Sequence, residues 1–361
     1  MPTLAGKSAP RSASLSRALK TQPSRPDLDP ELLGIGQFVN IYRSAKIVFA
    51  AASLDLFTLL EPHPKNLKEI CASLKLKARP TEIFLDALVS LGFLRKSNKA
   101  YSNATRSSRF LVRGKAGYCG PVLKFQNLLW PAWGELEHVL RSGSPSKNLG
   151  HWMRMSPDFT KEYIDCMARI SRQSAKEVAS FLTRPEDARL LDVGAGPGTF
   201  SLAMLERNPR LQAVLLDLPA TLRITKEFIA RHPARDRISL KPGNYHALRL
   251  KANSFDLILL SHMTHNEGPQ FSRKVLSACF EALRPGGRIA VHDFMTDPDG
   301  TTPKFCALFA VHMTVFTDEG AVYRAEQYQS WMREAGLTDL RKETICGDTE
   351  NLSQLLTGKK A

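Results

Sequence analysis

A glycine-rich turn between a strand-like segment and a helix-like segment is the feature that most constrains the fold. Residues 189–193 form a short apolar run, Gly194, Gly196 and Gly198 follow at alternate positions, and residues 201–207 continue with helical spacing. Glycine lets the chain turn tightly and lets a ligand approach without interference from a Cβ atom, while free N–H groups at the helix start face the ligand. The pattern predicts a nucleotide-binding strand–turn–helix unit.

Two carboxylates narrow the choice of ligand. Asp192 lies two residues before the first glycine, where it would crowd a pyrophosphate, so a cationic ligand fits better than a dinucleotide. Asp217 ends the next apolar run, residues 211–216, at a position where a carboxylate can accept hydrogen bonds from ribose hydroxyls. The glycine turn alone could be an ordinary strand-to-helix connection. Together with Asp217 and the later elements, it predicts a nucleotide site.

The C-terminal half alternates strand-like and helix-like segments, with helices expected to begin near residues 199, 220, 269 and 303. Such alternation implies right-handed crossovers and a mostly parallel sheet, with helices on both faces and ligands at the carboxyl ends of the strands. We expect this α/β domain to cover residues 183–361. Its predicted strands are 189–193, 211–217, 238–242, 255–261, 288–293 and 337–346.

The N-terminal part, residues 31–113, reads as a series of helices followed by a short hairpin at 94–102, which is the pattern of a winged-helix module. A DNA-reading helix carries Arg, Lys, Asn or Gln along one face. Residues 81–91 contain none of these and include Glu82 and Asp86. The module is therefore interpreted as a packing or dimerisation domain, with a DNA-binding regulator as the competing hypothesis.

Residues 114–182 are expected to form linker helices that contribute to a substrate pocket. They are rich in large apolar groups, and three of the four tryptophans of the chain lie between residues 130 and 152. Most such residues belong to the core, but some could line a pocket for a flat apolar molecule. The candidate pocket residues are Phe125, Trp130, Trp133, Met153 and Phe159, with Phe309 and Met313 from a later helix.

The net charge of +15, from 50 Lys and Arg against 35 Asp and Glu, allows an anionic partner such as nucleic acid without requiring one. Part of the excess lies in residues 1–26, which carry five basic residues and no acidic one. We expect a disordered tail over residues 1–30, with an organellar transit peptide as the alternative.

The sequence does not predict a membrane-spanning helix, a zinc site or a disulfide framework. The longest apolar stretch, near residues 47–60, is interrupted by Asp55 and is shorter than the ~20 residues of a membrane-spanning helix. The six cysteines form no CxxC pair, so neither a zinc site nor a disulfide framework is predicted. A reducing, cytoplasmic location is expected.

Five motifs in one order resemble the S-adenosylmethionine-dependent O-methyltransferases that act on small aromatic molecules, a family that includes caffeate-type, acetylserotonin, and bacterial pigment and polyketide enzymes of secondary metabolism. The N-terminal module is similar to the dimerisation domain of that family. The resemblance covers roughly residues 35–347 and implies a Rossmann-like catalytic domain, S-adenosylmethionine as cofactor and a homodimer. The motifs are LDVGAGPG at 191–198, LDLP at 216–219, PGNY at 242–245, HMTHN at 262–266 and LRPGG at 283–287.

The resemblance also implies residues that contact the cofactor. Gly194 would lie under its methionine part, Asp217 would hold the ribose, and Asn244 with Tyr245 would flank the adenine. The family usually has Asp in place of Asn244, but an amide can still hydrogen-bond an adenine amino group. The full predicted cofactor set is Asp192, Gly194, Ala195, Gly196, Asp217, Leu218, Asn244, Tyr245 and Ser261.

His265 falls at the family's general-base position, and Asp293 falls at the acidic position that would orient it. Glu326 is a looser match to a second acidic position, and Glu267 remains an alternative base. His262 is expected to be structural. A metal cluster of His262, His265, His292 and Asp293 is conceivable, but the family uses no metal and none is expected.

The leading hypothesis is a homodimeric O-methyltransferase acting on a small aromatic or polyketide-like molecule. Within the same fold, methylation of carbon or nitrogen, or a relative that binds the cofactor without methylating, stays open. An NAD-dependent oxidoreductase is disfavoured by Asp192 and by the spacing of the glycines. No motif identifies the methyl acceptor.

Overall fold

The computed structural model describes residues 30–349 and 352–361, so the predicted tail, apart from Pro30, lies outside the described residues. The chain divides into two compact units, residues 1–45 and 46–361. The domain boundaries expected near residues 113 and 182 remain predictions.

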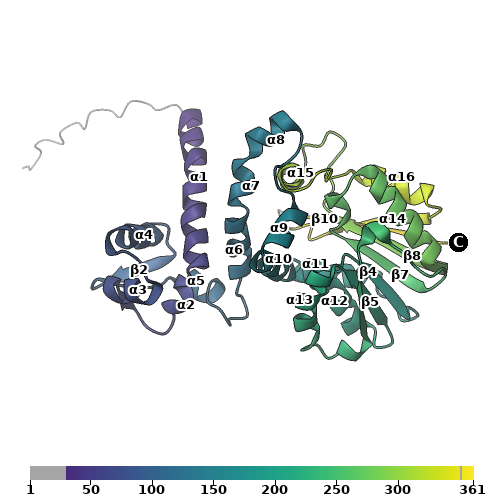
Figure 1. Ribbon diagram of the computed structural model, residues 1–361, viewed down its shortest axis with the longest axis horizontal. Helices are drawn as coiled ribbons and strands as arrows, with labels where there is room; N and C mark the ends of the chain where they lie inside the picture. Colours follow the sequence, from purple (N-terminus) through teal and green to yellow (C-terminus); the bar gives the residue numbers. More distant parts are fainter. Residues whose placement is uncertain (1–29, 350–351) are drawn as a thin grey trace, which may run out of the picture. The chain divides into compact units, whose positions relative to one another are not determined.

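A seven-stranded sheet organises the C-terminal half (Figure 1). Its strand order is β6-β5-β4-β7-β8-β10-β9, in which the first five strands are parallel and β10 is antiparallel to both of its neighbours. The predicted α/β class with a mostly parallel sheet is confirmed. The strands are β4 Arg189–Val193, β5 Gln212–Asp217, β6 Ile238–Pro242, β7 Phe255–Ser261, β8 Leu283–Asp293, β9 Thr338–Ile345 and β10 Ser353–Lys359.

Helices cover both faces at the centre of this sheet, which is why the central strands β4, β5 and β7 read as largely apolar runs. In β7, Leu257 and Leu259 pack into a core with helices α11 and α12, whereas Ile258 and Leu260 pack into a second core with α14 and α16. Figure 1 shows the sheet between these two groups. The helices are α11 Arg172–Leu182, α12 Thr199–Arg207, α13 Pro219–Ile229, α14 Pro269–Ala282, α15 Lys304–Phe316 and α16 Ala325–Glu334; the short helices are η1 Arg235–Arg237, η2 Tyr245–Ala247 and η3 Thr264–Asn266.

The N-terminal region combines helices with a small sheet of order β1-β3-β2. The hairpin predicted at 94–102 is present as β2 and β3, and helix α4 buries Thr81, Leu85 and Leu88 against the local core. This is the expected winged-helix-like arrangement. Its elements are α1 Pro30–Ser53, α2 Leu56–Leu59, β1 Lys65–Asn66, α3 Leu67–Leu74, α4 Ala78–Ser90, β2 Leu94–Ser97, β3 Ala100–Asn103 and α5 Thr105–Phe110.

Five helices connect the N-terminal region to the large sheet. Phe125 and Phe159, two of the predicted pocket residues, are 3% and 4% exposed and pack together in a separate apolar cluster. Phe159 also contacts Phe316, which stacks on His312 of α15, and the pocket role of Phe125 and Phe159 stays a prediction. The connecting helices are α6 Gly120–Leu128, α7 Trp130–Gly134, α8 Leu136–Ser142, α9 Leu149–Met155 and α10 Pro157–Ile170.

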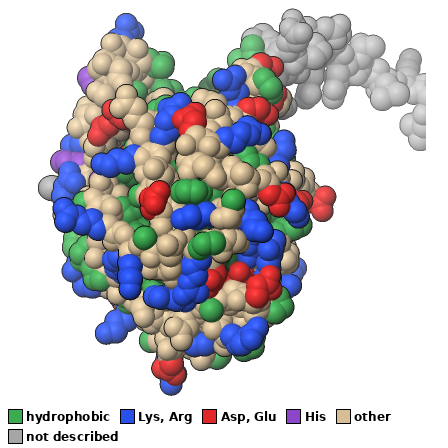
Figure 2. All heavy atoms as spheres, turned by 90° about the vertical axis from the view of Figure 1, so that its right-hand side faces the viewer, with side chains coloured by type: hydrophobic (Ala, Val, Ile, Leu, Met, Phe, Trp, Pro, Cys, Tyr) green, Lys and Arg blue, Asp and Glu red, His purple; other side chains and the backbone are tan. Residues whose placement is uncertain are grey.

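The positive charge is distributed on the face of the C-terminal half that Figure 2 presents. Lys and Arg side chains are spread across this face, with acidic and apolar side chains between them. Among the helices of the described residues, none is long and apolar enough to cross a lipid bilayer.

Candidate active site

The glycine turn after β4 has the backbone geometry that requires glycine. Gly194, Gly196 and Gly198 have φ angles of 71°, 53° and 79°, in the left-handed region that other residues rarely adopt. A Cβ atom on Gly198 would lie 2.8 Å from Leu215, whereas one on Gly196 would meet no atom within 4 Å. The turn is therefore tightly packed on one side and open at Gly196, where a ligand can approach the backbone.

Asp217, at the end of β5, is tied to this turn through both carboxylate oxygens. Its Oδ2 accepts a hydrogen bond of 2.7 Å from the Gly196 N–H, and its Oδ1 accepts one of 2.7 Å from the Leu218 N–H. Burial raises the pKa of Asp217 despite these donors. The structure thus brings together the two predicted cofactor elements, which are 21 residues apart in the sequence.

Asp192 lies under the same turn and is only 2% exposed. Its Oδ2 accepts a hydrogen bond of 2.6 Å from Ser201, a contact that the sequence pattern did not single out. Burial raises the pKa of Asp192 to about 7, and the charge of Asp217 adds to the effect. Within the described residues, neither carboxylate forms an ion pair with Lys or Arg. The site therefore fits a ligand that combines a ribose with a positive charge, as S-adenosylmethionine does.

The residues predicted to flank the adenine lie next to each other after β6. The exposed Asn244 caps the short helix η2 by accepting a hydrogen bond from the His246 N–H. The half-buried Tyr245 donates its hydroxyl proton to Glu267 over 2.9 Å, and His246 pairs with the same carboxylate. Glu267, the alternative base, is therefore already bound to these two side chains.

Ser261 and His292 form a buried pair at the ends of β7 and β8. Ser261 Oγ lies 2.9 Å from His292 Nδ1, and Ser353 Oγ of β10 lies 2.8 Å from His292 Nε2. Burial is the main cause that lowers the pKa of His292 far below its ordinary value. With both ring nitrogens occupied, His292 is a neutral structural group that connects three strands.

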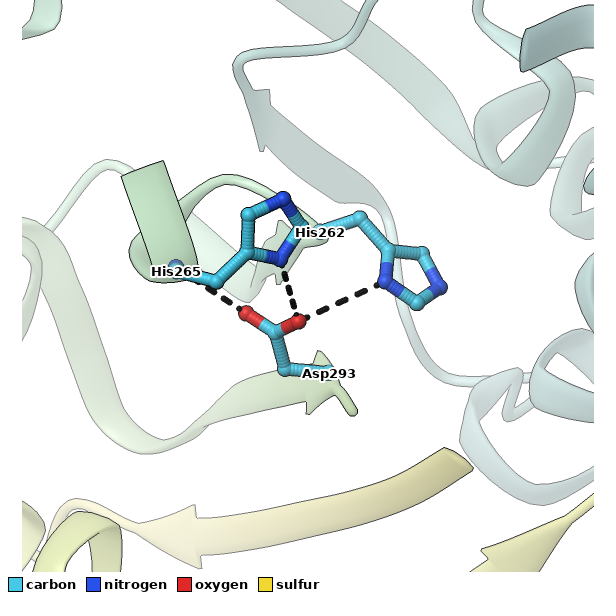
Figure 3. A group of neighbouring side chains, drawn as sticks. All are labelled: His262, His265 and Asp293. Carbon is cyan, nitrogen blue, oxygen red and sulfur yellow. Dashed lines mark hydrogen bonds and ion pairs between the residues drawn. The ribbon is translucent and has the colours of Figure 1, made fainter. Parts of the chain in front are cut away.

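His265 and Asp293 form a buried polar pair at the carboxyl edge of the sheet. His265 Nδ1 lies 2.6 Å from Asp293 Oδ1, and the two side chains are 8% and 0% exposed. Figure 3 shows the imidazole turned toward the carboxylate, with its second nitrogen pointing away. Because a carboxylate only accepts hydrogen bonds, Nδ1 carries the proton and Nε2 is left as an acceptor. This is the pairing predicted from the sequence.

Several further donors hold the Asp293 carboxylate in place. Oδ2 accepts a hydrogen bond of 2.8 Å from Thr264 and one of 3.4 Å from Tyr328, and Oδ1 accepts one of 2.9 Å from the Phe294 N–H. Burial alone would raise the pKa of Asp293, but the charge of His265 and the hydrogen bonds outweigh it and hold the pKa well below its usual range. Asp293 is therefore ionised in the folded chain.

Glu326 does not join this network. It lies in the first turn of α16 with an exposed side chain, and no hydrogen bond connects it to His265 in the described chain. The sequence places it near the motif, but its orientation on the helix turns it to the solvent. Of the two predicted carboxylates, the structure brings only Asp293 to the histidine.

His262 approaches the same carboxylate from β7. Its Nδ1 lies 3.4 Å from Asp293 Oδ1, without the geometry of a hydrogen bond. The candidate ligand atoms of His262, His265 and Asp293 lie within 4.8 Å of one another, a spacing that a metal ion could bridge. Oδ1 of Asp293, however, already accepts two hydrogen bonds. A site that works without metal therefore stays the prediction.

Aromatic rings form a wall beside His265. Phe309 of α15 meets the His265 ring edge-on at 5.0 Å, and Trp133 of α7 stacks on His312 at 6.0 Å. Burial, with a contribution from the charge of His265, lowers the pKa of His312 to about 4, so this ring is neutral. The sequence pattern did not single out Phe294, Phe305 or His312, although Phe305, Phe309 and His312 follow one another along α15 at helical spacing. The wall consists of Trp133, Phe294, Phe305, Phe309 and His312.

The other predicted pocket residues lie elsewhere. Trp130 packs against Phe49 at 6.4 Å, Met153 is half-buried against the cluster of Phe125 and Phe159, and Met313 is 3% exposed. Of the predicted set, Trp133 and Phe309 are rings of the wall, and the pocket role of the others stays a prediction. Large apolar residues in the connecting helices serve mainly as core.

Two family models match the chain. Residues 135–338 match an O-methyltransferase domain, and residues 37–113 match an O-methyltransferase dimerisation domain. The chain is 28% identical over 316 residues to the tetracenomycin polyketide synthesis 8-O-methyl transferase TcmO of Streptomyces glaucescens, covering 86% of this chain and 93% of that protein. It is 27% identical over 316 residues to the 3-hydroxy-5-methyl-1-naphthoate 3-O-methyltransferase of Streptomyces sahachiroi, covering 86% and 90%.

A solved structure agrees with this assignment. An O-methyltransferase family protein from Burkholderia thailandensis superposes with a TM-score of 0.83 at 25% identity, covering 91% of this chain and 98% of that one. The likeness extends over the N-terminal module, the connecting helices and the sheet. The chain therefore belongs to the O-methyltransferase family and is an S-adenosylmethionine-dependent methyltransferase.

Proposed function

We propose that this chain methylates a phenolic or enolic hydroxyl of a small aromatic or polyketide-like molecule, with His265 as the general base. One observation carries the proposal. A buried imidazole, oriented by an ionised carboxylate at 2.6 Å, borders a wall of aromatic rings at the carboxyl edge of the sheet. The names of the two Streptomyces relatives, which modify hydroxyls of a polyketide and of a naphthoate, support the same class of acceptor.

The roles of His265 and Asp293 follow from their protonation. S-adenosylmethionine, when bound, supplies a methyl group that is already activated on a sulfonium. The chain must then align the acceptor oxygen and remove its proton. Nε2 of His265 is the free acceptor that takes this proton, and the ionised Asp293 stabilises the imidazolium that results. The aromatic wall would hold the flat acceptor beside the histidine.

The proposal assigns the cofactor to the glycine turn. Asp217 would accept the ribose hydroxyls, because its carboxylate lies beside the open space at Gly196. Burial raises the pKa of Asp192 to about 7, and above that pH its carboxylate would provide negative charge near the cationic part. Of the remaining predicted contacts, Ala195 and Ser261 are buried, at 7% and 8% exposure, and Ser261 is also paired with His292. The other members are Gly194, Leu218, Asn244 and Tyr245.

We further propose a homodimer formed through the N-terminal module of residues 31–113, joined by linker helices 114–182 to the catalytic domain 183–361. Helix α1 exposes several large apolar side chains, a pattern typical of protein interfaces. These are Ile35, Phe38, Val39 and Ile41, which are 52–76% exposed. A cytoplasmic location is part of the same proposal and is supported by six free cysteines.

Methyl transfer from labelled S-adenosylmethionine to a panel of phenols tests the proposed activity, with mass spectrometry to locate the methyl group. Transfer to oxygen is expected. Transfer only to nitrogen or carbon of the same ring systems would contradict O-methylation and show N- or C-methylation in its place. Calorimetry should detect binding of S-adenosylhomocysteine, and saturable binding of NAD without it would contradict the cofactor assignment.

A further inference from the structure

Two imidazole nitrogens face one carboxylate oxygen at the proposed base. His265 Nδ1 lies 2.6 Å from Asp293 Oδ1, and His262 Nδ1 lies 3.4 Å from the same oxygen. Figure 3 shows each ring turning this nitrogen toward the carboxylate and its other nitrogen away from it. The proposed reaction uses one of these histidines and gives the other no role.

The Nδ1 atom of His262 is a buried polar atom without a partner. It makes no hydrogen bond within the described residues, although the Asp293 carboxylate is close. The backbone φ of His262 is 50°, in the left-handed region that is unfavourable for a residue with a Cβ atom. A buried unsatisfied atom and a strained backbone are both uncommon, and an ion that binds the atom is one explanation for them.

The three side chains form a ligand set that suits a transition-metal ion. One ligand atom from each of His262, His265 and Asp293 lies within 4.8 Å of the others. Two imidazoles and one carboxylate are typical of zinc sites that have three protein ligands and one open position. Within residues 30–349 and 352–361, no other group of three His, Cys, Asp or Glu side chains has such spacing.

One small movement would give the spacing that zinc requires. Ligand atoms at about 2.0–2.1 Å from a tetrahedral zinc ion lie roughly 3.3 Å from one another. The nitrogen of His262 already stands 3.4 Å from Oδ1, whereas that of His265 would have to retreat from 2.6 Å. Oδ1 also accepts a hydrogen bond of 2.9 Å from the Phe294 N–H, so the ion would take the place of the His265 proton on this oxygen.

We propose that Zn²⁺ binds Nδ1 of His262, Nδ1 of His265 and Oδ1 of Asp293, and that it inhibits methyl transfer. The inference rests on the proposed function and adds regulation to the same site. Metal coordination needs the lone pair of each Nδ1, so each neutral ring keeps its single proton on Nε2. Nε2 of His265 is then a donor and no longer accepts the proton of the acceptor hydroxyl.

Metal binding is measured without reference to activity. Calorimetry with ZnCl₂, on the chain without a histidine tag, should show saturable binding of roughly one ion per chain. Co²⁺ should bind the same site, with visible absorption that reports nitrogen and oxygen coordination. MgCl₂ is the control and should not bind, because Mg²⁺ prefers six oxygen ligands.

Two variants remove the second imidazole in different ways. His262→Phe keeps an aromatic ring, and His262→Asn keeps a residue that tolerates the left-handed conformation. Both should weaken zinc binding by about 100-fold or more, since even the loss of an outer-shell partner costs roughly 10–100-fold. His138→Phe, at an exposed position of α8, is the matched control and should bind zinc as the wild type does.

Inhibition is measured with a phenol that has a single hydroxyl, so that the acceptor does not chelate the metal. At a zinc concentration about ten times its Kd, roughly one tenth of the metal-free rate should remain, as mass action for one site requires. Excess EDTA should restore the rate. Each His262 variant, compared with its own metal-free rate, should keep most of its activity at the same zinc concentration.

The outcomes separate the metal site from the function on which its effect depends. Absence of zinc binding, or equal affinity in the wild type and both His262 variants, would overturn the site. Stoichiometric binding that leaves the rate unchanged would overturn the inhibition. Failure to methylate any phenol in the absence of zinc would contradict the proposed function, whereas calorimetry and Co²⁺ absorption would still decide whether the site exists.

Discussion

The Asp192→Asn variant should be more stable than the wild type. The difference in their free energies of unfolding should be larger at pH 8 than at pH 5. The carboxyl group is 2% exposed, and its one side-chain hydrogen bond, from Ser201, does not compensate for burial. Burial therefore raises the pKa of Asp192 from 3.8 to about 7. Between these two values the folded chain holds a proton that the unfolded chain has released.

The sign and the size of the effect follow from this difference. Because the folded state binds more protons in this window, the stability of the wild type falls as the pH rises through it and levels off above about 7. Between pH 5 and 7 the loss is roughly 2 kcal/mol, because the slope of about 1.4 kcal/mol per pH unit halves as the pH reaches the folded-state pKa. Asparagine does not ionise, so this contribution to the fall in stability with pH is absent from the variant.

Urea unfolding at pH 5 and pH 8 measures the effect, followed by circular dichroism and by tryptophan fluorescence. Coincident transitions are required because the chain has more than one compact unit. Asp236→Asn, at a side chain that is 86% exposed, controls for the loss of one negative charge. If the difference between Asp192→Asn and wild type were the same at both pH values, burial would not be raising this pKa and the reasoning would be wrong.

Three further substitutions test other parts of the structure. Asp217→Ala should weaken binding of S-adenosylhomocysteine in calorimetry by roughly 1–3 kcal/mol, since ribose hydroxyls would lose their acceptor; unchanged affinity would remove Asp217 from the site. Arg288→Ala should lower the free energy of unfolding by about 3–5 kcal/mol, because it leaves the buried Asp187 without its partner at 2.7 Å; a loss below about 1 kcal/mol would contradict this. Phe38→Asp should convert the proposed dimer to monomers in light scattering, and an unchanged mass would place the interface elsewhere.

The central strands β4, β5 and β7 could be predicted closely because they are largely buried on both faces, whereas β6 is a partly exposed edge strand. The ranges expected for β4, β6 and β7 agree with the structure, and that for β5 begins one residue early. Continuous apolar runs that end in Gly, Asp or Ser give a strong local signal. The pairing of His265 with Asp293 also followed, because both residues stand where neighbouring parallel strands end.

Other features depend on contacts that a linear pattern does not contain. Strand β10 was missed because Ser353–Lys359 contains only two apolar side chains, Leu355 and Leu356, between polar residues, and its place between β8 and β9 is what makes it a strand. Thr264 and Tyr328 meet at 2.8 Å across 64 residues of sequence. No pattern in the local sequence predicts a contact between residues so far apart.

The choice of pocket residues shows a limit of predicting a site from residue type alone. Phe125 and Phe159 have the size and apolarity of wall residues, yet the structure buries them together with their rings 5.7 Å apart. Composition does not distinguish a core aromatic from one that faces a cavity. The helical spacing of Phe305, Phe309 and His312 was the more informative signal, because residues three and four positions apart share a helix face.

The rate of methyl transfer by His265→Gln, compared with wild type across a range of pH, tests the central claim most directly. Below the pKa of the phenol used as acceptor, the loss should be on the order of 10²–10⁴-fold, the usual contribution of a general base. Affinity for S-adenosylhomocysteine should stay near the wild-type value, and the loss should shrink as the pH rises above the phenol's own pKa. Full activity of His265→Gln at a pH where the phenol is protonated would contradict the assignment of His265 as the base.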